Sequence, residues 1–194
     1  PYPQTERVAA SVSFGDMVEG TFWALYLWLF ALMWLAAAVE LGPDQWFPAM
    51  MKELTGMEGI IFLCYTAGLI FLIRYFGSEL VHRFSPFMVL IVCSILTFVG
   101  LYWLGSLTVG ASAGGAFLAA TTLGIGKSFV WPTMLGIVAA RLPTGGALTL
   151  NLMGGAGMPP IALVLPVMGG QLDRAGAGAP FVPLSYLAWL VFAV

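Results

Sequence analysis

Charged side chains are too rare in this chain to cover a water-soluble fold. Only 8% of the 194 residues are charged and 60% are hydrophobic, whereas soluble domains carry about 25% charged and roughly 45–50% apolar residues. A soluble protein of this size could not hide so much apolar surface from water. The composition therefore predicts an integral membrane protein. Because every backbone polar group in lipid must be satisfied internally, we expect an all-α fold.

Apolar runs of roughly bilayer-spanning length follow one another along the chain. A spanning helix needs about 20 mostly apolar residues, and we expect spans at 23–50, 57–76, 87–107, 113–138 and 147–168, with a sixth beginning near Pro180. The sixth run ends at Val194 and is short of a full span, and the chain begins with Pro1 rather than Met. We therefore expect a fragment: a cytoplasmic linker at 1–20 and a six-helix transmembrane domain at 21–194 whose last helix is truncated.

The basic residues predict an orientation, because cytoplasmic loops carry an excess of Lys and Arg. Lys127 falls within a span and is not counted. If both termini are cytoplasmic, two basic residues lie outside, Lys52 and Arg174, and four lie inside, Arg7, Arg74, Arg83 and Arg141. We expect a multi-pass protein of the inner (plasma) membrane in this orientation.

Composition also narrows the classes of function. The net charge of −2 excludes a broad basic surface for nucleic acid. His82 is the only histidine, and the two cysteines, Cys64 and Cys93, lie in apolar runs, so no zinc-binding spacing is present. We expect no metal site, no cofactor and no catalytic constellation.

An acidic segment interrupts the first expected span. Glu40 and Asp44 flank Gly42 and Pro43, and apolar residues continue on both sides. Proline removes a backbone hydrogen bond and crowds the preceding turn, and discontinuous helices of this kind form many transporter binding sites. We expect a broken helix whose acids line such a site, with Gln45 beside them. The alternative is that the helix ends at Gly42-Pro43 and Asp44 begins an outer loop.

Lys127 stands near the middle of the fourth expected span. A charged lysine at that depth costs about 2.5 kcal/mol or more unless it faces a partner or a water-filled cavity. Glu40 is the first candidate partner and Asp44 the second. The alternatives are a purely structural ion pair or a shifted helix end.

Glycines and a weak repeat complete the pattern. An offset of 84 residues aligns Gly42 with Gly126 and Pro48 with Pro132, which predicts an inverted three-plus-three repeat relating the first and fourth spans. Glycines that we expect to permit close helix packing open the fourth span and lie in the fifth; they are Gly114, Gly115, Gly154, Gly155 and Gly157.

Three stretches resemble the C-terminal six-helix half of the major facilitator superfamily. They are ELGPDQWFP at 40–48, GIGKSFVWPT at 124–133, and GGALTLNLMGGAG at 145–157 followed by PVMGGQLDR at 166–174. The resemblance implies half of a 12-helix transporter, with a missing N-terminal six-helix half as its partner. The family's loop signature is degenerate here, since GSELVHR at 77–83 has His82 where an acid is expected. Arg83 and His82 are therefore candidate gating residues.

The resemblance also implies a site, because the first and fourth helices of each half line the central cavity in that family. Carried onto this chain, the candidate substrate contacts are Glu40, Asp44, Gln45, Lys127 and Trp131. Asn151 in the fifth span joins them, with a helix-to-helix hydrogen bond as its alternative role.

The expected function is secondary active transport of a small polar solute, for example a sugar-like one, by alternating access. Proton or ion coupling makes the protein a symporter whose partners are the solute, protons and membrane lipid. The alternatives are a six-helix membrane enzyme, which would need a catalytic constellation, and a non-transporting scaffold in which Glu40 and Lys127 form a buried pair.

Overall fold

A computed structural model describes residues 13–21, 23–81 and 83–175, and within these ranges the chain is helical and contains no strand. The elements are α2 (Phe14–Thr21), α3 (Ala24–Thr55), α4 (Gly59–Val81), α5 (Pro86–Ser106), α6 (Ala113–Lys127), α7 (Val130–Arg141), the 3-10 turn η1 (Pro143–Gly145), α8 (Gly146–Gly155) and α9 (Met158–Ala175).

Five helical segments are long and apolar enough to cross a membrane: Ala24–Thr55, Gly59–Gly77, Pro86–Ser106, Ala113–Arg141 and Pro143–Gly170. They coincide with five of the six expected spans. The expectation of an all-α protein with several membrane-length helices is therefore confirmed for the described residues. The expected sixth span, from Pro180 onward, lies outside them.

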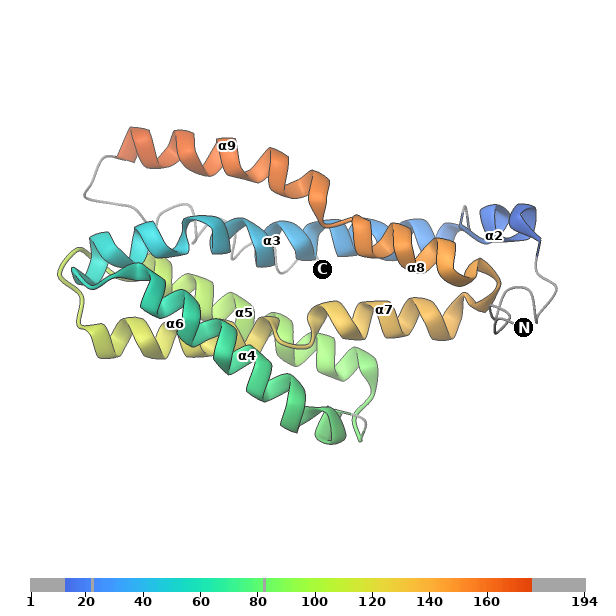
Figure 1. Cartoon of the computed structure of the whole chain (residues 1–194), viewed down its shortest axis with the longest axis horizontal. Coiled ribbons are helices and arrows are strands. Elements are labelled where there is room, and N and C mark those ends of the chain that lie inside the picture. The colour runs from blue at the N-terminus through green and yellow to red at the C-terminus, as the bar shows by residue number, and fades with distance from the viewer. Residues whose placement is uncertain (1–12, 22, 82, 176–194) are drawn as a thin grey trace, which may run out of the picture.

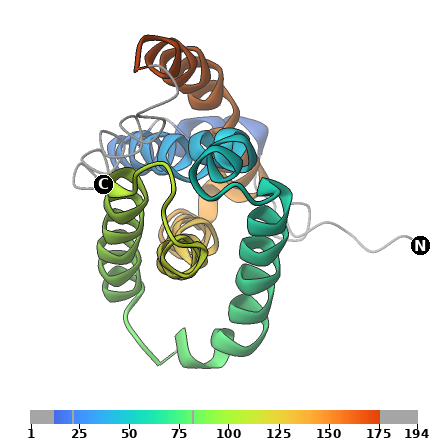
Figure 2. The same ribbon diagram turned by 90° about the vertical axis from the view of Figure 1, so that its left-hand side faces the viewer.

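The helices form an elongated bundle around α3. Figure 1 shows α3 running along the long axis, while α6 and α7 follow each other as one interrupted rod and α8 and α9 as another. In the end view of Figure 2, α4 and α5 stand on either side of the α6–α7 rod, and α9 lies beyond α3. The contacts of α3 with α4, α7 and α9, and of α6 with α4 and α5, agree with this arrangement.

Two apolar clusters divide the core along the length of α3. The C-terminal half of α3, including Phe47 and Met51, packs with α4, α5 and α6. Its N-terminal half, including Tyr26 and Met33, packs with α7 and α8. A small third cluster that contains Ala36 joins α3 to α5 and α7. The charged residues described below lie at this junction.

Helix α2 begins inside the expected linker. Ser13 and Asp16 form a reciprocal capping box: the Ser13 hydroxyl accepts a hydrogen bond from the Asp16 N–H at 3.2 Å, and the Asp16 carboxylate accepts one from the Ser13 N–H at 3.0 Å. Hydrogen bonding to the carboxylate by the Ser13 side chain, and next by the Ser13 backbone N–H, lowers the pKa of the Asp16 carboxyl from its ordinary value. The helix packs against η1 and α8, so this part of the chain belongs to the folded unit.

Close helix packing depends on different glycines from most of those expected. A Cβ at Gly100 of α5 would come within 2.6 Å of the Leu123 backbone in α6, and a Cβ at Gly126 of α6 would overlap the Thr97 backbone in α5. These two glycines allow α5 and α6 to approach along their whole crossing, an arrangement typical of membrane helices.

Among the expected glycines, Gly157 does make a close contact, because a Cβ there would overlap the Trp131 ring. Among the described residues, a Cβ at Gly114, Gly154 or Gly155 would meet nothing within 4 Å, and a Cβ at Gly115 would meet only the Ser112 hydroxyl of its own N-cap, so these four glycines make no close helix contact with the described residues. Glycine content alone does not reveal which helix face is covered.

Candidate functional site

The fourth membrane segment is interrupted at its centre. Helix α6 ends at Lys127 and α7 begins at Val130. The Ser128 hydroxyl donates a hydrogen bond to the Gly124 carbonyl at 2.6 Å, and Arg74 Nε of α4 donates one to the Ser128 carbonyl at 2.7 Å. A backbone break in a membrane is tolerated where neighbouring groups satisfy the freed polar atoms, and Arg74 supplies one such group here.

Helix α3, by contrast, is continuous, so the expectation of a break at Gly42-Pro43 is wrong. The helix runs from Ala24 to Thr55 with Pro43 and Pro48 inside it, which also excludes the alternative of a helix end before Asp44. Tertiary packing explains the result. Gly42 and Pro43 are buried, and a Cβ at Gly42 would come within 2.9 Å of Val164 in α9.

An ion pair joins α3 to the interrupted segment. Lys127 Nζ lies 2.5 Å from Asp44 Oδ1, and the Lys127 side chain is only 5% exposed against 28% for Asp44. The prediction that Glu40 is the lysine's first partner is wrong; the second candidate, Asp44, takes that place. Because α3 stays helical, Asp44 sits one turn beyond Glu40 on the same face and is the acid that lies against the end of α6.

Glu40 has a cationic neighbour of its own. Arg74 Nη2 lies 4.0 Å from Glu40 Oε1, and the side chains are 44% and 12% exposed. The orientation argument counted Arg74 as a cytoplasmic loop residue, but the structure places it inside the second span with its guanidinium against Glu40 and Ser128. Without Arg74, the bias of basic residues falls to three against two.

Glu40 and Lys127 face one small cavity at this junction. The cavity leaves the centre of a water molecule about 20 Å³ in which to move, somewhat more than the roughly 10–15 Å³ that one water needs. Glu40 Oε2 and Thr97 Oγ1 are buried and have no hydrogen-bond partner among the described residues. The remaining lining residues come from α3, α5 and α7: Ala36, Val39, Ser94 and Val130.

Two acidic and two basic side chains meet at this junction. We call them the charge cluster: Glu40, Asp44, Arg74 and Lys127. Both acids belong to α3, and the two cations come from α4 and α6. Such an arrangement can exchange partners with a polar solute and can hold a proton on a carboxylate. Within residues 13–21, 23–81 and 83–175, no group of three metal-ligating side chains occurs.

The other predicted site residues lie apart from the charge cluster or outside the described residues. Gln45 is exposed on α3, and Asn151 is exposed on α8, which packs against α2 and α7. Trp131 packs against Gly157. Arg83 is exposed in the turn between α4 and α5, and His82 is not among the described residues.

Sequence reasoning missed Arg74, Ser94 and Thr97 as site residues. Arg74 carried a usable signal, because an arginine within the expected span at 57–76 needs a partner as much as Lys127 does. Ser94 and Thr97 carried no such signal in the sequence, since small hydroxyl side chains occur throughout membrane helices and form local hydrogen bonds.

Comparisons of the chain with protein-family models, curated proteins and solved structures find no match. The functional argument below therefore starts from the charge cluster and its cavity.

Proposed function

We propose that the protein is a secondary active transporter that moves a small polar solute across the inner membrane by proton-coupled alternating access. In this proposal the chain corresponds to the C-terminal half of a major facilitator transporter and works with a second six-helix half. One observation carries it: ionised side chains from three membrane-length segments meet at the interruption between α6 and α7.

The energetic cost of these residues favours a functional role. Each charged side chain near the centre of a membrane helix costs about 2.5–3.5 kcal/mol on insertion scales, and such residues mark solute and proton pathways. Glu40 Oε2 and Thr97 Oγ1 have no hydrogen-bond partner among the described residues and lie beside a cavity large enough for a water molecule. These free acceptor positions support a site that a solute, water or a proton can reach.

Glu40 is the residue that we assign to proton coupling. Its Oε1 lies at 4.0 Å from Arg74, beyond hydrogen-bond distance, and its Oε2 has no partner among the described residues. A proton on this carboxyl group therefore breaks no hydrogen bond. Asp44, held at 2.5 Å by Lys127, would lose its ion pair on protonation and is less suited to the role.

Uptake by vesicles that contain the purified full-length transporter, with both six-helix halves of the proposal, tests it. Radiolabelled sugars, sugar acids, nucleosides and amino acids are offered with an inward proton gradient to wild type, Lys127→Ala and Lys52→Ala. Lys52 is the matched control, because its pair with Glu58 is exposed at the end of the bundle. We expect saturable uptake of one class of solute, a loss of about tenfold or more in Lys127→Ala, and wild-type rates in Lys52→Ala.

The same experiment separates the alternatives. A scaffold would move no solute although the protein is folded, and Lys127→Ala would change stability alone. A membrane enzyme would convert a solute without concentrating it inside the vesicles, which chromatography of the vesicle contents detects.

A further inference from the structure

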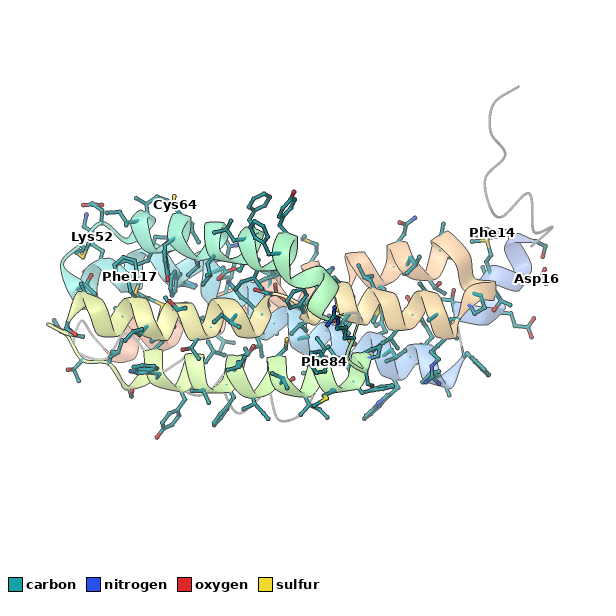
Figure 3. All side chains as sticks on the ribbon, turned by 90° about the horizontal axis from the view of Figure 1, so that it is seen from below. Phe14, Asp16, Lys52, Cys64, Phe84 and Phe117 are labelled. Atoms are coloured by element: carbon teal, nitrogen blue, oxygen red, sulfur yellow. The ribbon has the colours of Figure 1, made fainter. Side chains whose placement is uncertain are left out.

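A second and much larger cavity lies beside the charge cluster. It has a volume of about 700 Å³ and is bounded by the end of α4, the turn into α5, and α7 from the interruption to its last residue. Figure 3 places Phe84, one of its lining residues, near the middle of the long axis, where α4 and α5 end and leave α7 uncovered. The volume is within the roughly 300–1,000 Å³ of pockets for small organic molecules.

The lining of this cavity has one sign of charge and a large aromatic surface. Among the described residues, the charged side chains that line it are Arg74 and Arg141. No described Asp or Glu lines it, and Arg141 makes no ion pair with the described residues. Phe84, Phe87 and Phe129 supply the apolar walls. Arginine guanidinium groups bind carboxylates in a bidentate manner and stack on aromatic rings, so the lining matches an anion with a flat apolar body.

Arg74 connects this cavity to the charge cluster. Its side chain is 44% exposed and lies 4.0 Å from Glu40 on one side, while it also lines the large cavity. Of its five N–H donors, one is used by the Ser128 carbonyl. The rest of the guanidinium is available to a ligand, and a carboxylate ligand would compete with Glu40 for the same cation.

We propose that the large cavity binds a soluble amphipathic organic anion, an aromatic or similarly apolar carboxylate, and that this anion is the transported solute. The inference rests on the proposed function and deepens it. The carboxylate pairs with Arg74 at the start of α7, and the apolar body packs against the three phenylalanines. Arg141, at the other end of α7, adds a second positive charge to the cavity.

Binding of the anion changes the charge balance at Glu40. The ionisable groups near Glu40 are Asp44 on α3, Arg74 on α4, the Cys93 thiol on α5 and Lys127 on α6. Two cations face the Glu40 carboxylate, Arg74 and Lys127. Lys127 is already paired with Asp44, so diversion of Arg74 to the ligand removes the counter-charge that Glu40 does not share with Asp44. Glu40 then takes up one proton from water, so one anion and one proton enter together and the net charge of the site is unchanged.

Photolabelling of the protein in vesicles tests the inference without requiring transport. The probe is tritiated 4-benzoylbenzoate, an aromatic carboxylate, and its uncharged counterpart is 4-benzoylbenzamide. Wild type, Arg74→Gln, Arg141→Gln and the control Lys52→Gln are labelled in phosphatidylcholine vesicles, with and without phosphatidylglycerol. Mass spectrometry locates the label. Bulk uptake of protons is followed with a pH-sensitive dye inside the vesicles.

We expect the carboxylate to label residues 84–87 or 129–141. Labelling should fall about tenfold in Arg74→Gln, as the loss of one charged hydrogen bond predicts, and should also fall in Arg141→Gln, which removes the second positive charge of the cavity. Lys52→Gln should label like wild type, and the carboxylate should carry protons inward.

Equal labelling by the amide, no loss in Arg141→Gln, or displacement by phosphatidylglycerol would overturn the inference, the last by identifying a lipid site. Proton-coupled uptake of a neutral solute together with any of these results would leave the transport proposal standing and refute only the anion.

Discussion

Lys127 at the end of α6 and Asp44 in the middle of α3 form an ion pair between residues 83 positions apart in sequence. The pair fastens an interrupted membrane segment to a continuous one. Arg74 secures the same interruption from α4 through the Ser128 carbonyl. The interruption and the charge cluster are thus one structural unit, and the predictions below address its parts in turn.

Removing either partner of the Asp44–Lys127 pair should destabilise the protein more than removing both. A buried charge left without its partner costs about 3–5 kcal/mol, so Asp44→Asn and Lys127→Met should each lower the free energy of unfolding by that order. The double variant leaves no buried charge unpaired and should therefore lose less than either single variant. The coupling energy should thus be at or above the upper end of the roughly 0.5–3 kcal/mol found for residues in contact. Denaturant unfolding in mixed micelles measures all four proteins.

Two further double-mutant cycles serve as controls for this pair. The exposed Lys52–Glu58 pair, with side chains 60% and 68% exposed, should show a coupling below about 1 kcal/mol. Glu40→Gln with Lys127→Met should couple more weakly than Asp44→Asn with Lys127→Met. A stronger coupling to Glu40 than to Asp44 would contradict the pairing that the structure gives.

The crossing of α5 and α6 should not tolerate a methyl group. Gly126→Ala and Gly100→Ala each place a Cβ against backbone atoms of the opposite helix, and overpacking of this kind costs typically about 1–3 kcal/mol. Gly68→Ala is the control, since a Cβ at this exposed position in α4 meets nothing within 4 Å. Midpoints of thermal unfolding compare the three. A loss at Gly68→Ala equal to that at Gly126→Ala would count against the close crossing.

Glu53 and Thr144 should lie on opposite sides of the membrane, because three membrane segments separate them. Both residues are exposed. Single cysteines at these positions, in a protein without Cys64 and Cys93, are treated with an impermeant maleimide in intact cells. We expect labelling at Glu53→Cys and protection at Thr144→Cys. The reverse pattern would invert the orientation, and equal labelling would exclude an odd number of crossings.

The positions of five of the six expected membrane segments could be predicted from sequence, because hydropathy over about 20 residues reports directly on bilayer crossing. The location of the helix break was not. Pro43 and Pro48 are strong helix breakers in isolation, yet α3 continues through both, since Gly42 and Pro43 are buried and Gly42 packs closely against α9. The interruption instead follows Lys127, where Ser128 and Arg74 satisfy the freed backbone.

The residues of the candidate site could be predicted only in part, and their pairing could not, again because helix continuity was misjudged. Charged residues within apolar runs are easily recognised in a sequence, and Glu40, Asp44 and Lys127 do lie close together in the structure. Which acid pairs with Lys127 depends on the face of α3 that each acid occupies and on its depth in the membrane. A sequence-based prediction that assumes a helix break at Pro43 places the acids on the wrong face. Arg74 was overlooked because it lies near the edge of its expected span.

Access of water to the charge cluster from both sides of the membrane is the most direct test of alternating access. Ser94 lines the small cavity, and a Ser94→Cys variant lacking Cys64 and Cys93 is treated with a charged, impermeant thiosulfonate in intact cells and in inverted vesicles. A lipid-facing thiol does not react, because the nucleophile that attacks the thiosulfonate sulfur and displaces sulfinate is the thiolate, which forms in contact with water. We predict reaction in both preparations, whereas Glu53→Cys and Thr144→Cys each react in only one. Reaction of Ser94→Cys from a single side, or from neither, would contradict a transport site at the charge cluster.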